Sequence, residues 1–167
     1  KTYLASAHDC LPQKVAAQLH QQYVNWLLTS DIVRHDVAKR LEVLHLLETA
    51  SLDAAGQFDP GKDSEAHNWF SYMSDALHAQ TLQCDNTVFK DPEFAKACFE
   101  RAASTFGQLG DGGVRYLIET GNTSFLETLG IYFLMHFIVY GFNTPELSQK
   151  LDLYISLLEN QKPNREV

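Results

Sequence analysis

Apolar positions recur along the chain mostly at intervals of three and four residues, between clear stop and start signals. That spacing is typical of amphipathic α-helices, because a strand would alternate polar and apolar residues. We expect helices at about residues 11–29, 31–55, 63–82, 91–109, 114–120, 124–140 and 144–160. The pattern therefore predicts an all-α fold: a single helical bundle of about six to seven helices, with residues 1–167 as one domain.

One segment is apolar on nearly every helical face, from Phe125 to Phe142. Such a helix is either a membrane span or a core helix. It carries Glu127, Thr128 and His136 without flanking basic clusters, whereas a span needs about 20 mostly apolar residues with interfacial anchors. We interpret residues 124–141 as a central core helix around which the other helices pack, and we expect no membrane span.

Composition and charge indicate a globular protein and argue against nucleic-acid binding. The 167 residues are 45% hydrophobic and 20% charged, as in a globular protein. There are 21 acidic and 13 basic residues, and the net charge of −8 argues against a surface that follows nucleic-acid phosphates. The acidity favours solubility and, for a protein partner, a basic or mixed surface.

The three cysteines, Cys10, Cys84 and Cys98, form no C-x-x-C motif. So few cysteines indicate free thiols in a reducing compartment, and we expect a cytoplasmic protein. A Cys10–Cys84 disulfide and a cleaved leader before Lys1 remain open alternatives.

Two carboxylate–histidine pairs have the i, i+3 spacing that di-metal helical bundles use: Glu42 with His45, and Asp75 with His78. Metal ligands must project into the bundle. At 100° per residue, Glu42 points away from the apolar arc of its helix, His45 lies at the border, and His78 also points away. We therefore expect solvated faces, no metal site and no cofactor.

Glu48 breaks the pattern, because it falls within the apolar arc of its helix. A buried carboxylate needs a partner, or its pKa rises. The alternative, which we favour, is that Glu48 lies beyond the packed part of the helix, near Gly56, and reaches solvent through its long side chain.

Tyr132, His136 and Tyr140 are spaced by four and form a column on one face of the most apolar helix. We favour a neutral core histidine, hydrogen-bonded through one ring nitrogen. The alternative is a pocket wall in which these three residues, and Glu48 with them, bind a ligand.

No motif of nucleotide binding or of nucleophilic catalysis is present, so we lean against an enzyme. The first hypothesis is a non-catalytic interaction protein: an accessory subunit, an adaptor or an immunity-type inhibitor. Four apolar residues lie off the main stripes of their helices and either extend its binding surface or contact a second layer of the same bundle: Val24, Leu28, Leu153 and Leu157. The alternative is a bundle that binds a small apolar ligand, haem or metal beside the central helix.

Overall fold

A computed structural model describes residues 12–141 and 145–160 of the chain, without the side chains of residues 32 and 146. It is 86% helical and has no strands in this part of the chain, which confirms the predicted all-α bundle. The helices are α2 (Gln13–Leu28), α3 (Asp31–Arg34), α4 (Val37–Ala55), α5 (Asp63–Thr87), α6 (Pro92–Glu119), α7 (Thr123–Tyr140) and α8 (Pro145–Asn160). Cys10 lies outside the described residues.

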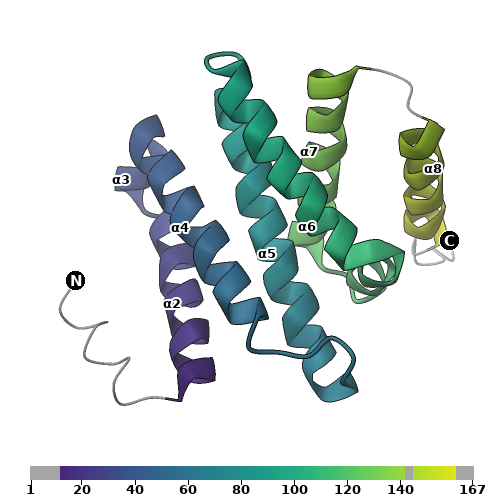
Figure 1. Ribbon diagram of the computed structural model, residues 1–167, viewed down its shortest axis with the longest axis horizontal. Helices are drawn as coiled ribbons and strands as arrows, with labels where there is room; N and C mark the ends of the chain where they lie inside the picture. Colours follow the sequence, from purple (N-terminus) through teal and green to yellow (C-terminus); the bar gives the residue numbers. More distant parts are fainter. Residues whose placement is uncertain (1–11, 142–144, 161–167) are drawn as a thin grey trace, which may run out of the picture.

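Helix α5 holds the bundle together. It packs against α4, α6 and α7, while α2 packs on α4, and α8 makes a smaller contact with α6 (Figure 1). Short connections join α4 to α5 and α5 to α6, so each neighbour runs antiparallel to α5 and the two run parallel to each other (Figure 1). The helices thus form a row in which α4 and α6 share α5 as their common support.

The apolar helix α7 does not take the central place that we expected from its composition. It packs on α5 and α6, but only 28% of the segment Thr123–Tyr140 is buried. It is long and apolar enough to cross a membrane by length and composition, a criterion that core helices of soluble proteins also meet. The central position instead belongs to α5, whose polar residues pair across the helix interfaces.

Glycine interrupts α6 within the stretch where the sequence predicted a break. We expected a break at 110–113 followed by a separate short helix. In the structure two helical segments meet at a kink at Gly110, whose φ of 61° and ψ of 176° are not helical, and the second segment ends at Glu119. A positive φ is accessible to glycine at little cost, which explains the residue at this kink.

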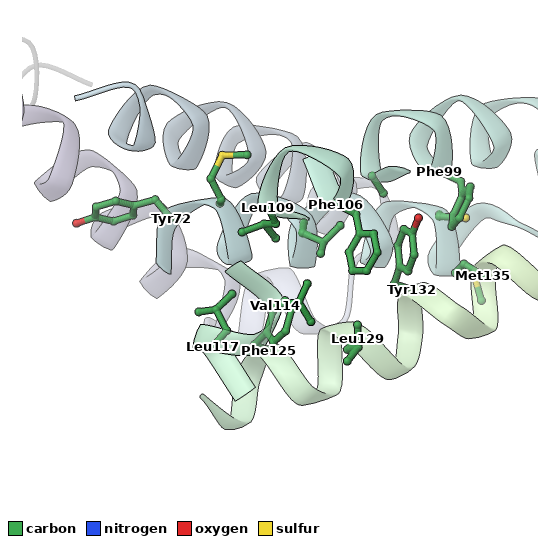
Figure 2. Close-up of a cluster of buried hydrophobic side chains, with 14 of the residues drawn as sticks. Tyr72, Phe99, Phe106, Leu109, Val114, Leu117, Phe125, Leu129, Tyr132 and Met135 are labelled. Carbon is green, nitrogen blue, oxygen red and sulfur yellow. The ribbon is translucent and has the colours of Figure 1, made fainter. Parts of the chain in front are cut away.

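The largest hydrophobic cluster joins α5, α6 and α7 (Figure 2). Its centre is aromatic: the Tyr132 ring stacks on Phe106 at 4.4 Å and on Phe99 at 5.2 Å between ring centroids. A smaller cluster joins α2, α3, α4 and α5 around Val24, Leu44 and Leu47. Two clusters that meet at α5 divide the bundle into a half built on α4 and a half built on α7.

Candidate functional site

A buried carboxylate, Glu48, joins α4 to α5 and α6. Its side chain accepts hydrogen bonds from Arg101 Nε at 2.8 Å, from Gln83 Nε2 at 2.9 Å and from Gln80 Nε2 at 3.1 Å. Arg101 Nη2 also donates to Oε2 at 3.3 Å. Burial raises the pKa of Glu48, but the hydrogen bonds from Arg101, Gln83 and Gln80 outweigh it and hold the pKa below its usual value.

This geometry corrects our interpretation of Glu48. Only 5% of the residue is exposed, so it does not reach solvent near Gly56. The sequence analysis missed Arg101, the cation that neutralises it. The available signal was weak: Arg101 lies at the edge of the apolar arc of its helix, and a cation there can pair with a carboxylate within the arc of a neighbouring helix.

A groove of about 600 Å³ lies beside this ion pair, between α4 and α6. It exists because both helices pack on α5 and not along each other. One face of α4 lines it, at the helical spacing 41, 45, 48, 49 and 52, with Phe94 and Arg101 of α6 opposite. The lining residues are Leu41, His45, Glu48, Thr49, Leu52, Asp53, Gln83, Phe94 and Arg101.

A second carboxylate, Asp75 on α5, has no cation beside it. Its Oδ2 accepts a hydrogen bond from Gln21 Nε2 at 2.8 Å. Burial raises the pKa of Asp75 to about 6, and the Gln21 hydrogen bond opposes that rise. Asp75 is therefore a candidate for titration near neutral pH in the folded protein.

His78 also differs from expectation, because it faces α7 and not solvent. Its Nδ1 lies 2.8 Å from Thr128 Oγ1, and burial lowers the pKa of the ring. The pair resembles a base and a hydroxyl nucleophile, but Thr128 is completely buried and its hydroxyl also donates to the Ser124 carbonyl. No substrate can reach it. Among the described residues no three histidine, cysteine, aspartate or glutamate side chains gather as a metal site would require.

The residues Tyr132, His136 and Tyr140 do form a column, and Phe99 contacts all three rings. The Nδ1 atom of His136 is buried and has no hydrogen-bond partner, and burial lowers the pKa of the ring. Burial raises the pKa of Tyr132 to about 12, so its hydroxyl stays protonated. His136 and Tyr132 line a cavity of about 190 Å³ between α6, α7 and α8.

Glu48 is not part of this column. It lies on α4, which does not pack on α7, and it lines the groove on the other side of α6. The four residues that we considered as one ligand site thus belong to two separate places. The groove at Glu48 is the larger of the two.

Helix α2 exposes its large apolar residues. It buries Ala16, Gln21 and Val24 and leaves a row of four residues on the surface, which we call the α2 stripe: Val15, Leu19, Tyr23 and Trp26. Val24 is buried in the smaller core cluster, and Leu28, Leu153 and Leu157 are half-buried against the two clusters. Of our two interpretations of these four residues, contact within the bundle is therefore the correct one. An amphipathic helix usually packs its large apolar residues against the core, so the burial of α2 is inverted.

The outward face of α7 is a second exposed apolar surface. Leu134 and Ile138 are exposed, and a side-chain carbon placed on Gly130 would meet nothing within 4 Å. The absence of a side chain at Gly130 leaves room for a neighbouring helix on this face. No described helix lies against it.

Comparisons with known proteins identify no relative of this chain. No family model matches it, no curated protein matches its sequence, and no solved structure matches its fold. Three features of the described residues are candidates for function: the α4–α6 groove, the α2 stripe and the α7 face.

Proposed function

We propose that this chain is a non-catalytic interaction protein, an accessory subunit, adaptor or immunity-type inhibitor, that binds a protein partner through the α2 stripe. The observation that carries the proposal is the inverted burial of α2. The helix buries only Ala16, Gln21 and Val24 and leaves an indole, a phenol and two aliphatic side chains on the surface. A contiguous exposed apolar patch of this kind is typical of a binding surface.

The composition of the stripe supports binding. Trp26 is 64% exposed and its ring stacks on Tyr23 at 6.2 Å between centroids. Tryptophan and tyrosine are the residues that most often dominate the energy of protein interfaces. Because the opposite face of α2 is fixed on α4, the stripe is held on a rigid helix, and less conformational entropy is lost when a partner binds.

The net charge of −8 indicates which partner the chain favours. A partner whose apolar patch is surrounded by basic or mixed charge gains association rate from the opposite potentials. An acidic partner would be repelled. We therefore expect binding that slows as the salt concentration rises, because salt screens the attraction between surface charges.

The alternative function, a small-ligand, haem or metal site at His136, is supported by one observation, the unpaired buried Nδ1 atom. A bound hydrogen-bond donor or a metal ion would satisfy that nitrogen. The cavity beside it measures about 190 Å³, whereas binding pockets for drug-sized ligands occupy about 300–1,000 Å³. We therefore rank this function second.

Site-specific photo-crosslinking in the native cells tests the interaction proposal. A photoreactive amino acid replaces Leu19 or Trp26 in the stripe, and the matched control carries it at Leu134 on the α7 face. We expect the two stripe positions to capture the same partner, and the control position not to capture it. Capture of that partner from Leu134 alone, or different proteins from the two stripe positions, would overturn the role of α2.

A fluorescence measurement then tests direct contact with the captured partner. The chain has two tryptophans, so Trp69→Phe leaves Trp26 as the only one. Emission from Trp26 should shift to shorter wavelength when the purified partner buries the indole. An unchanged spectrum at saturating partner would contradict burial of Trp26, while the reverse variant, Trp26→Phe, supplies the baseline from Trp69.

A further inference from the structure

The α2 stripe borders a second row of exposed residues, on the outer face of α4. Glu42, Leu46 and Asp53 follow one another at intervals of four and seven residues, so they share one face of that helix. Leu46 is 41% exposed, and both carboxylates are exposed. The row adds an apolar side chain and two charges to the surface that binds the partner, and its meaning therefore rests on the proposed function.

The packing of α2 on α4 places this row beside the stripe. Asp53 lines a hollow of about 230 Å³ together with Ala17 of α2, so the outer face of α4 adjoins α2 there. The two helices run antiparallel (Figure 1). Leu46, seven residues before Asp53 and about 10 Å along the axis, is therefore level with the part of α2 that carries Tyr23 and Trp26.

The stripe and the row also lie on the same side of the α2–α4 pair. On α2, Gln21 marks the side that faces α5, because it donates a hydrogen bond to Asp75. On α4, Glu48 marks that side, because it accepts a hydrogen bond from Gln80 of α5. At 100° per residue, the stripe is centred roughly opposite Gln21, and Leu46 lies roughly opposite Glu48. Both surfaces therefore face away from α5, and we call them together the α2–α4 face.

Two carboxylates of the α2–α4 face have no counter-ion among the described residues. Neither Glu42 nor Asp53 forms an ion pair within this part of the chain. The lysines of the two helices are already engaged: Lys14 of α2 lies 3.5 Å from Glu65, and Lys39 of α4 lies 3.4 Å from the aspartate that caps its own helix. A partner that covers the stripe therefore gains most from cations placed at the two ends of the row.

The geometry of the stripe fits a helix better than an extended segment. Val15 and Trp26 are eleven residues apart, so the stripe runs along three turns of α2, or about 16 Å. A second helix laid along it presents a side chain at every third or fourth residue and keeps contact over that length. An extended segment binds by adding a strand to a sheet edge, and the described part of the chain has no strands to offer one.

We infer that the partner binds the α2–α4 face with a basic amphipathic α-helix. The apolar side chains of that helix lie on the stripe and on Leu46, and its lysines or arginines face Glu42 and Asp53. These two carboxylates are eleven residues apart on α4, so the cations that meet them lie about three turns apart on the partner helix. Apolar anchors spaced by three and four residues are the general means by which an amphipathic helix is recognised.

Three synthetic peptides of about 18 residues, long enough to follow the whole stripe, test the kind of helix. The first has leucines spaced by four, three and four residues with lysines beside them. The second replaces the lysines with glutamates, and the third scrambles the order of the first. Titration calorimetry with the unmodified chain should show one molecule of the first peptide per chain, bound at least tenfold more tightly than either of the others. No binding of the first peptide, or equal binding of the scrambled one, would overturn the inference.

Two pairs of neutral substitutions locate the contact. Glu42→Gln with Asp53→Asn removes the charges of the row, whereas Glu93→Gln with Glu100→Gln removes the same number of charges from α6. All four residues are exposed, so both double variants should fold. We expect the first to bind the lysine peptide at least fivefold more weakly and the second to change its affinity less than twofold. Equal losses would show that the peptide responds to net charge alone and would refute the site.

The photo-crosslinks at Leu19 and Trp26 separate the role of the partner helix from the role of the stripe. The two positions are seven residues apart, about two helical turns. When both capture the same partner, the linked residues on it should lie about seven residues apart in one segment. Links to two separate segments of one partner would overturn the helix and leave the stripe as a binding surface. Different proteins at the two positions would refute the proposed function itself.

Discussion

Glu48 on α4 and Asp75 on α5 are two carboxylates that the bundle shields from water, and they differ in the number and charge of their hydrogen-bond donors. Glu48 accepts hydrogen bonds from two glutamines and also has the Arg101 guanidinium beside it. Asp75 accepts a single hydrogen bond, from Gln21. The pKa of Glu48 is held below its usual value, whereas the pKa of Asp75 rises to about 6.

The difference shows that burial alone does not decide whether a carboxylate stays ionised. Desolvation raises the pKa of both groups. A guanidinium with several hydrogen bonds reverses the effect, while one neutral amide does not. The two sites therefore respond to acid in opposite directions, and substitutions at Glu48 and Asp75 should separate these responses.

The largest effect is expected from removing the cation. Arg101→Ala leaves Glu48 buried without its counter-ion, and breaking a buried pair in this way costs roughly 3–5 kcal/mol. Because Arg101 is partly exposed, we expect a loss near the lower end, about 3 kcal/mol of unfolding free energy, measured by urea denaturation at pH 7. Lys96→Ala, an exposed lysine of the same helix, is the control and should change stability by less than about 0.5 kcal/mol. Equal effects of the two substitutions would refute a structural role for the ion pair.

Removing the charge of Asp75 should instead increase the free energy of unfolding. Asp75→Asn keeps an oxygen that accepts from Gln21 and removes a charge that the folded protein disfavours at pH 7. A pKa raised from 3.8 to about 6 corresponds to roughly 3 kcal/mol at 1.36 kcal/mol per unit, so we expect the variant to be more stable by up to that amount. A destabilised variant at pH 7 would contradict the raised pKa.

The pH dependence of that gain gives a sharper comparison. A carboxyl whose folded pKa is raised contributes stability that is present below its unfolded pKa, 3.8 for Asp75, and is lost as the pH rises through about 6. The stability difference between Asp75→Asn and the wild type should therefore grow from pH 4 to pH 7. Glu48 has the opposite sign: its contribution is present above its unfolded pKa of 4.5 and is lost as the pH falls through the lower folded value. Denaturation curves at several pH values measure both, and a difference that is flat between pH 4 and pH 7 would contradict the assignment.

The smallest effect concerns His136, a buried polar side chain that hydrogen bonds do not fully satisfy. Its Nδ1 atom lacks a partner, so His136→Leu removes an unsatisfied group and keeps most of the contact with Phe99. We expect a change in unfolding free energy within about 1 kcal/mol. Native mass spectrometry of the same two proteins checks the alternative function: a ligand carried by the wild type and lost in the variant would show that His136 binds it.

The helical periodicity was enough to predict the fold class, because each long helix has its own start and stop signals. The periodicity did not predict that the helix expected at residues 31–55 is interrupted at Asp36. The Asp36 side chain accepts hydrogen bonds from the backbone N–H groups of Ala38 and Lys39 and caps the start of α4. A capping aspartate inside an apolar pattern is visible in a sequence, but aspartates within helices are common enough that the cap becomes evident only from the geometry.

The candidate sites depended on contacts between helices, which periodicity does not encode. The angular position of Glu48 correctly raised the possibility of burial, but only the packing of α4 and α6 on a common helix identified Arg101 as its partner. The burial of α2 was inverted for a similar reason: its arc of large apolar residues does not face α4. Hydrophobicity indicated which faces need a partner, and not whether that partner belongs to the same chain.

The four glycines of α6 imply an uneven tolerance to mutation along a single helix. Side chains added at Gly107 or Gly112 would meet nothing within 4 Å, and alanine is the better helix former at both. Gly110 needs its positive φ, and a side-chain carbon on Gly113 would lie 2.8 Å from the Phe70 ring. Homologous sequences should therefore vary freely at Gly107 and Gly112 and retain glycine at Gly110 and Gly113, so that two conserved glycines mark this kink.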